Sequence, residues 1–386
     1  MISQPFQRIA SNTALPRFPA ERGFTLVEIL VALALSSIIA LAAIASLTVA
    51  RTGFTDVDAS SQLRDNGRFA AEMIKRVVVQ AGYKNSDYAA ATTAFANTTT
   101  TTPEPDISGV NNVIVKTSLL PDLETAFLTR PGANATDSKC ASSPDPACDN
   151  GSDALIIRYQ TSPSIAGSST SDGSMINCAG IADMTVPANA DDRMISVIHV
   201  AKSTTGSEPS LMCSYRSSAG VWTTQPIVEG VESFQVLYGV DGVTTNANTT
   251  FPSTLRDSVP DRYFNASQMV SGGDTVVANR VLPTTYGNWS AVRSLRIGLV
   301  LRGPANSAPV KSGNITTLCP LGYLDGSVIT PITVINPVTH CIDPPSSGNN
   351  ATTSPGSEFP RKGAAIADDG RLRQVLTFTV HLRNRQ

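Results

Sequence analysis

The longest apolar stretch of the chain runs from Ile29 to Ala50 and contains no charged residue in its 22 positions. An α-helix rises 1.5 Å per residue, so this stretch would be roughly 33 Å long, enough to cross the ~30 Å hydrocarbon core of a bilayer. No proline interrupts residues 20–102, and helical periodicity continues beyond the apolar stretch. We therefore predict one spine helix over residues 24–82, with a transmembrane part at about residues 24–50.

The outer part of this predicted helix carries a second apolar pattern, with a spacing of about four residues. The residues of this stripe are Phe69, Met73, Ile74, Val77, Val78 and Ala81. Charged residues lie between them, so we predict that the stripe packs under a sheet while the charged face meets solvent. Gly82 is expected to end the helix, because glycine readily adopts the left-handed conformation found at helix C-termini.

Beyond the helix, five short segments have the apolar pattern of strands, and four of them alternate apolar with polar residues. The predicted strands cover residues 153–160, 194–200, 232–241, 295–302 and 376–383. Such alternation is typical of an antiparallel sheet with one face on a core and the other in solvent. The predicted fold class is α+β, with a long N-terminal hydrophobic spine helix whose outer half packs on an antiparallel β-sheet head with long polar loops.

The charges of the chain are nearly balanced, with 29 basic and 31 acidic residues. No overall field therefore attracts nucleic acid or acidic substrates. The sequence also has no basic cluster with interleaved aromatic residues, which is the pattern of many nucleic-acid-binding surfaces. We expect no nucleic-acid partner.

The cysteines all lie in the C-terminal two-thirds of the chain, at Cys140, Cys148, Cys178, Cys213, Cys319 and Cys341. They form no C-x-x-C pair and only three histidines are present, which argues against a zinc site. An even number confined to one part of the chain predicts disulfides in an oxidising compartment. Sequence alone does not choose among the pairings. Because short loops lose the least entropy on closure, our hypothesis is Cys140–Cys148, Cys178–Cys213 and Cys319–Cys341.

The residues before the apolar stretch are basic and polar: Arg8, Arg17 and Arg22 are opposed only by Glu21. The positive-inside rule then leaves the N-terminus in the cytoplasm and sends everything after Arg51 outward. A secretory signal would have a shorter apolar stretch followed by its cleavage site. Here the basic leader comes first and the apolar stretch follows it, which predicts a helix that stays attached as an anchor.

The six residues from Gly23 to Glu28 read Gly-Phe-Thr-Leu-Val-Glu at the head of this apolar stretch. This sequence resembles the type IV prepilin cleavage motif, which pilins share with type II secretion pseudopilins. The resemblance implies that residues 1–23 are a leader removed by a membrane prepilin peptidase, which cuts between Gly23 and Phe24 and then N-methylates Phe24. Gly23 suits such a cut, because a residue without Cβ lets an extended backbone lie close against a protease.

Glu28 is the single charge in the apolar part of the predicted mature helix. A carboxylate in a membrane helix costs about 2.5–3.5 kcal/mol at the bilayer centre on insertion scales, and commonly marks function. One interpretation is that Glu28 simply reaches the lipid headgroups. Within the pilin motif we prefer a second one, in which Glu28 pairs with the α-ammonium of Phe24 on a neighbouring subunit and fixes the register of the helices during assembly.

Four further segments resemble the PilW family of minor pilins: residues 65–68, 150–153, 228–241 and 372–385. Together with the leader motif they extend from residue 23 to residue 385, although the loops between them do not match. One departure is the leader, which at 23 residues is longer than that of many pilins. The resemblance implies three regions, namely the leader at 1–23, the spine helix at 24–82 and a β-rich head at 83–386.

Nothing in the sequence favours an enzyme, since G-x-S-x-G, H-E-x-x-H and Walker motifs are all absent. We interpret His199, His340 and His381 as structural or surface residues and expect no catalysis, cofactor or metal. The leading hypothesis is a minor type IV pilin that helps initiate or cap pilus assembly. Alternatives are a type II secretion pseudopilin and a pilus-tip adhesin or ligand-binding subunit.

The expected partners are the prepilin peptidase, other minor and major pilins, and the inner-membrane platform for pilus assembly. The expected location is the inner membrane, crossed once, with the head in the periplasm or, after assembly, in the extracellular pilus.

Overall fold

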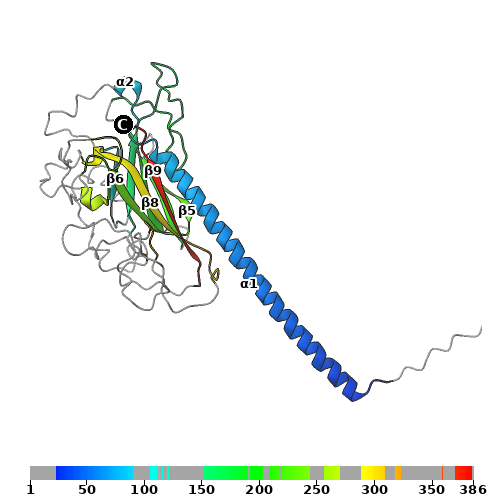
Figure 1. Ribbon diagram of the computed structural model, residues 1–386. Helices are drawn as coiled ribbons and strands as arrows, with labels where there is room; N and C mark the ends of the chain where they lie inside the picture. The colour runs from blue at the N-terminus through cyan, green and yellow to red at the C-terminus, as the bar shows by residue number, and fades with distance from the viewer. Residues whose placement is uncertain are drawn as a thin grey trace, which may run out of the picture. The chain divides into compact units, whose positions relative to one another are not determined.

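The computed structural model describes the amino-terminal helix and the strands of the head (Figure 1). The described residues are 23–89, 105–111, 113, 115, 120, 152–189, 192–202, 208–216, 220–243, 256–269, 288–308, 318–322, 359 and 370–384. The chain divides into two compact units, the first ending at Phe54 and the second beginning at Thr55.

The first unit contains the apolar part of helix α1 (Leu26–Val78). Every residue from 23 to 55 is exposed in the single chain. Ser36, Ser37 and Thr48 each donate a hydroxyl hydrogen bond to a carbonyl three residues earlier, at 2.8 to 3.0 Å. These bonds satisfy the hydroxyls without water, as hydrocarbon surroundings require. By length and composition, α1 is the one helix among the described residues that could cross a membrane.

From residue 55 onward, α1 packs into the core of the head along one face. Its buried residues are Ala59, Leu63, Gly67, Ala70, Ala71, Ile74, Val77 and Val78. The predicted stripe is therefore correct for Ile74, Val77 and Val78, but it is wrong for Phe69, which is 52% exposed. Small residues take the place expected for Phe69, because the helix backbone lies close to a strand at Gly67.

Helix α1 ends at Val78, four residues before the glycine predicted to stop it. The chain continues in tighter turns, since the N–H groups of Gln80 and Ala81 donate to carbonyls three residues earlier at 3.1 and 3.0 Å. Gly82 then takes a φ of 71° and its N–H donates to the Arg158 carbonyl at 3.0 Å. Gly82 thus turns the chain, and the short helix α2 (Ser86–Ala89) follows.

The first sheet has five strands in chain order, and every neighbouring pair is antiparallel. The strands are β1 (Ile107–Val110), β2 (Ala154–Tyr159), β3 (Met194–Lys202), β4 (Pro209–Arg216) and β5 (Trp222–Glu229). The predicted segments 153–160 and 194–200 correspond to β2 and β3. The other three strands are not predicted by the sequence pattern.

The second sheet has the order β7-β6-β8-β9 and is also antiparallel. Its strands are β6 (Val231–Val240), β7 (Arg262–Phe264), β8 (Val292–Arg302) and β9 (Arg373–His381), and the 3₁₀ helix η4 (Ala266–Met269) follows β7. Val236 lies opposite Ile297, which in turn lies opposite Phe378. The three alternating patterns predicted for β6, β8 and β9 therefore place their apolar residues on one shared face.

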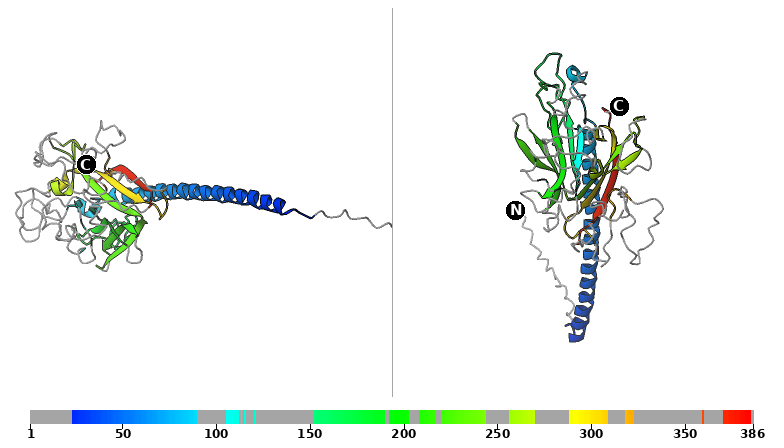
Figure 2. Two further views of the ribbon diagram at one scale, coloured as in Figure 1. Left: turned by 90° about the horizontal axis from the view of Figure 1, so that it is seen from below. Right: turned by 90° about the vertical axis from the view of Figure 1, so that its left-hand side faces the viewer.

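The predicted α+β class is confirmed, with two differences in how the head is built. It contains two sheets where the pattern suggested one, and Figure 2 shows them as separate groups of strands. The expected solvent face is also wrong for β2 and β6, which are buried along their whole length. The main core joins α1 to both sheets, and a second cluster with Val113 and Leu120 packs on the first sheet.

Candidate functional site

The predicted processing site lies just before the helix and is fully accessible. Gly23, Phe24 and Thr25 are not helical, and all three are exposed. The Phe24 ring is 83% exposed, and no described residue beyond the chain neighbours lies within 4 Å of the position that a Cβ on Gly23 would occupy. An uncovered backbone outside the helix is what a protease needs in order to bind the chain at the predicted bond.

Glu28 lies in the first turn of α1 and binds Thr25 of its own chain. One carboxylate oxygen, Oε2, accepts the Thr25 N–H and the Thr25 hydroxyl, both at 2.9 Å. In return, the Glu28 N–H donates to Thr25 Oγ1 at 3.3 Å. This reciprocal arrangement is a capping box, with Thr25 as the N-cap residue and Glu28 three residues later. Sequence reasoning singled out Glu28 but missed Thr25, although the Thr-x-x-Glu spacing is the signal for it.

Two of the segments that resemble the PilW family, residues 65–68 and 372–385, connect α1 to β9. In the first segment, a Cβ on Gly67 would lie 3.4 Å from Leu376 of the second. The Lys75 ammonium lies 5.7 Å from the centre of the Phe378 ring. Asn384 donates side-chain hydrogen bonds to the carbonyls of Val79 and Ala81, which are free because the helix has ended. These segments therefore seat the helix on the sheet.

A third family-like segment connects the two sheets through residues just before β2. The Asp153 N–H donates to the Phe234 carbonyl at 2.8 Å, and Asp153 Oδ2 accepts the Val236 N–H at 2.9 Å. Ser152 Oγ accepts the Phe234 N–H at 3.3 Å. Both partners belong to β6, so Ser152 and Asp153 extend the pairing of the second sheet into the first. Residues 150 and 151 lie outside the described chain.

The fourth segment contains the turn by which the chain passes from one sheet to the other. Gly230 separates β5 from β6 with a φ of 82°. Its N–H donates to the Pro209 carbonyl at 2.8 Å, and its carbonyl accepts the Arg302 N–H at 2.7 Å. A Cβ here would lie 2.7 Å from the Arg302 carbonyl oxygen. Both the conformation and the space therefore require glycine.

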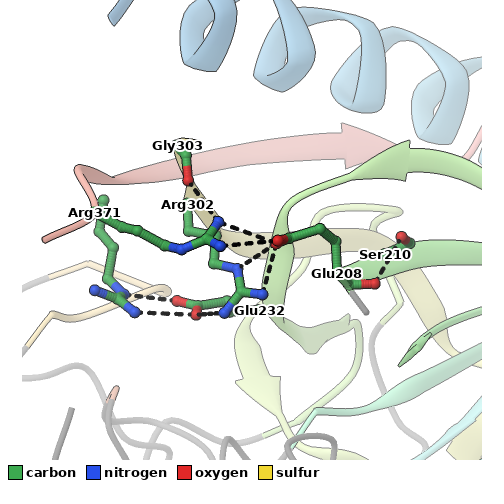
Figure 3. Close-up of polar contacts among 7 residues, drawn as sticks. Glu208, Ser210, Glu232, Arg302, Gly303 and Arg371 are labelled. Carbon is green, nitrogen blue, oxygen red and sulfur yellow. Dashed lines mark hydrogen bonds and ion pairs between the residues drawn. The ribbon is translucent and has the colours of Figure 1, made fainter. Parts of the chain in front are cut away.

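Beside this turn, two glutamates and three arginines form a network that we call the arginine cluster (Figure 3). Arg302 and Arg371 both bind Glu208, at 2.6 and 2.9 Å. Arg302 and Arg373 both bind Glu232, at 3.0 and 2.7 Å. Glu208 immediately precedes β4 of the first sheet, whereas Glu232, Arg302 and Arg373 belong to the second. The cluster therefore ties the two sheets together at one end.

The charges of the arginine cluster change the acidity of Glu208. Burial acts to raise the pKa of this carboxyl, but hydrogen bonds and charges from Arg302 and Arg371 outweigh it and hold the pKa below its ordinary value. The cluster is not evident from the sequence. Arg302 and Arg373 occur as polar positions inside alternating strands, and nothing in that pattern says that they meet the same carboxylates.

The described residues include three of the six cysteines, Cys178, Cys213 and Cys319. A disulfide joins Cys178 to Cys213, with their Cα atoms 5.5 Å apart, as in the hypothesis above. Cys319 is also disulfide-bonded. Its proposed partner Cys341 and the proposed pair Cys140–Cys148 lie outside the described residues.

The described histidines have no arrangement that suggests catalysis. His199 in β3 is 1% exposed, its Nε2 lies 2.9 Å from Ser214 Oγ, and burial lowers its pKa to about 4. His381 ends β9, and His340 lies outside the described residues. Within the described part of the chain, no three histidine, cysteine or acidic residues gather as metal ligands would.

Two family models match the chain in different places. The prokaryotic N-terminal methylation motif matches residues 19–44, which include Gly23, Phe24 and Glu28. The family described as type IV pilus-assembly protein W matches residues 197–384, from β3 through β9. The chain is a minor type IV pilin that resembles the PilW family. It therefore belongs to a class of structural subunits, and its motif implies processing by a prepilin peptidase and interaction with other pilins.

One solved structure similar to this pilin is a type IV-like pilin from Thermus thermophilus. The two are 11% identical, the match covers 84% of this pilin and 98% of the other chain, and the TM-score is 0.30. No curated protein matches this pilin. The family assignment rests on the two family models, which between them cover the processing motif and most of the strands. The motif and the apolar helix together identify a membrane-anchored pilin.

Proposed function

We propose that this minor pilin helps to initiate or cap the assembly of a type IV pilus. The observation that carries the proposal is the first unit, in which every residue from 23 to 54 is exposed although most are apolar. An exposed apolar helix surface of this kind is unfavourable for a single chain in water. It suits a helix that leaves the lipid to pack among the helices of other pilins.

The sequence of the apolar helix supports such packing. Small residues recur along it, among them Ala32, Ser36, Ala40 and Ala43. In membranes, helices associate where small side chains let their backbones approach closely. The charge of Glu28 would add register, because a carboxylate in hydrocarbon is stabilised when the α-ammonium of a neighbouring Phe24 meets it.

The proposed mature pilin begins at Phe24, after removal of residues 1–23. Residues 24–50 would cross the inner membrane, and the rest of α1, which ends at Val78, would carry the head at 83–386 on the periplasmic side. This orientation follows from the excess of arginine before the membrane span. The head would contact other minor pilins, and the assembly platform in the inner membrane would receive the helix.

We assign no enzymatic activity to the head. His199 is buried, and its pKa of about 4 leaves it neutral at physiological pH within the first sheet. In the arginine cluster both carboxylates form ion pairs with arginines, so neither is available as a general base. Both features support a structural role.

The test is deletion of the gene in its host, in a background that cannot retract pili, so that surface pili report assembly alone. We expect several-fold fewer pili, with recovery on expression of the wild-type protein. Pili at the normal number would contradict a role in initiation or capping. If these pili then bound surfaces less well, the subunit would be an adhesin instead. If export of type II secretion substrates failed, it would be a pseudopilin.

A further inference from the structure

The bond that the peptidase is proposed to cut lies two residues before the first helical residue, Leu26. The first hydrogen bond of the helix runs from the Ile29 N–H to the Thr25 carbonyl, at 3.3 Å. Thr25 is thus the last residue outside the helix, and Gly23 and Phe24 precede it without helical structure. The place where the helix begins decides whether the scissile bond is extended or helical.

The sequence before Thr25 does not stop a helix strongly by itself. Between Pro19 and Gly23 stand Ala20, Glu21 and Arg22, three residues that favour helix formation. If the helix grew by one turn toward the leader, the Gly23 carbonyl would accept a hydrogen bond from the Val27 N–H, following the helical i to i+4 pattern. The carbonyl that the protease must attack would then be engaged within the helix.

Two bonds of the capping box oppose this growth. The Thr25 N–H is bound to Glu28 Oε2 at 2.9 Å, so it no longer needs a carbonyl one turn earlier. The Glu28 N–H is bound to Thr25 Oγ1 at 3.3 Å, and this geometry requires non-helical backbone angles at the N-cap residue. Thr25 therefore sets the first helical residue through its side chain.

We propose that Thr25 is a positioning residue for leader removal. Its capping box with Glu28 ends the helix after the scissile bond and so presents the Gly23–Phe24 bond to the peptidase in extended form. This inference rests on the processing step proposed above. It adds a residue that the cleavage chemistry itself does not require, and it gives Glu28 a role in the precursor before any neighbour is present.

The test measures the rate of leader removal from the full-length chain by pulse-chase, in cells that contain the peptidase. Thr25→Val keeps the shape of the side chain and loses Oγ1, whereas Thr25→Ser keeps the capping oxygen. Thr25→Asn has a different shape but is a good N-cap residue. We expect Thr25→Val to slow cleavage roughly fivefold, the population ratio that a typical cap contributes. Thr25→Ser and Thr25→Asn should be cleaved at the wild-type rate.

Two outcomes would overturn the inference. Cleavage of Thr25→Val at the wild-type rate would show that the cap does not matter. Slow cleavage of Thr25→Asn, equal to that of Thr25→Val, would show that the peptidase contacts the threonine side chain directly. Gly23→Leu serves as the uncleaved control. If the wild-type chain were not cut between Gly23 and Phe24 at all, the proposed processing would fail, and that result is distinct from either of the other two.

Discussion

Among the described residues Glu28 binds Thr25, and in the proposed assembly it binds a different partner. In the chain it accepts both hydrogen bonds from Thr25 with one carboxylate oxygen. Pairing with an α-ammonium needs the negative charge, whereas capping needs only an acceptor. Glutamine can fill the third position of a capping box as well as glutamate, so the two roles can be separated by removing the charge alone.

Glu28→Gln should therefore be processed and inserted like the wild type but should support few or no surface pili. The measurement is the pilus count in the deletion strain, with immunoblots to verify equal amounts of mature protein. Thr25→Ser, which keeps both the cap and the charge of Glu28, is the matched control and should restore pili. Normal piliation with Glu28→Gln would instead favour the simpler interpretation, in which Glu28 only reaches the headgroups.

Gly67 shows how closely the helix approaches the second sheet. A Cβ here would lie 3.4 Å from Leu376 and 3.7 Å from Leu301, so a methyl group fits and a longer side chain does not. Gly67→Ala should leave the free energy of unfolding unchanged or raise it by up to about 1 kcal/mol, since alanine favours helix. Gly67→Leu should lower it by roughly 1–3 kcal/mol through overpacking. Urea unfolding of the detergent-solubilised protein measures both, and equal effects would refute the close contact.

At the scale of elements, strands that alternate over a full length could be predicted and the others could not. The segments that form β6, β8 and β9 show clear alternation because apolar residues of each pack into the core that also contains α1. β5 contains Pro226 and has four polar residues among its eight, a composition that an edge strand tolerates. β1 has only four residues, one of them Gly109. Such strands are formed by pairing with their neighbours, and their own sequence does not reveal them.

The residues of the candidate site also fall into two groups, those that could be predicted from the sequence and those that could not. Gly23, Phe24 and Glu28 could be found because they form a local motif, read from adjacent residues. The arginine cluster could not, because Glu208 and Arg371 are 163 positions apart and meet only after both sheets have formed. Phe69 was misplaced for a related reason: periodicity identifies a helix but does not say which face approaches a sheet.

The arginine cluster should make the head sensitive to acid. Because the folded-state pKa of Glu208 lies below its ordinary value of 4.5, its stabilising contribution is present above that pH and is lost as the pH falls through the folded-state pKa. Glu208→Gln should thus lower the free energy of unfolding by about 1 kcal/mol at pH 7. The difference from wild type should shrink toward zero well below pH 4.5.

Thermal unfolding at a series of pH values measures this effect. Glu229→Gln, at an exposed position of β5, is a matched control for the loss of one negative charge. A difference between wild type and Glu208→Gln that stays constant across the acid range would contradict the assigned ion pairs.

At the scale of the whole molecule, the disulfide between Cys178 and Cys213 links the segment between β2 and β3 to β4 across 35 positions. Closing a loop of this length in the unfolded chain removes conformational entropy, worth about 4 kcal/mol in the usual model. The free energy of unfolding of the Cys178→Ala/Cys213→Ala double variant should therefore be lower by about that amount. The variant should unfold at a lower urea concentration than the wild type. The wild type and the variant are both unfolded in urea, with and without reductant. Equal free energies of unfolding for the two proteins without reductant would refute the contribution of the disulfide to stability.

The burial of this disulfide also determines when it can form relative to the folding of the head. Cys178 is 1% exposed and Cys213 is 0% exposed, so an oxidising enzyme cannot reach either sulfur once the head has closed. The bond must form while β4 is still uncovered, before the second sheet docks on the first. A cell that oxidises thiols slowly would therefore make chains that fold without the bond and are less stable by about the amount given above. These chains would unfold more often and be cut by proteases, and the shortage would appear as low abundance of the subunit rather than as a defect in its assembly.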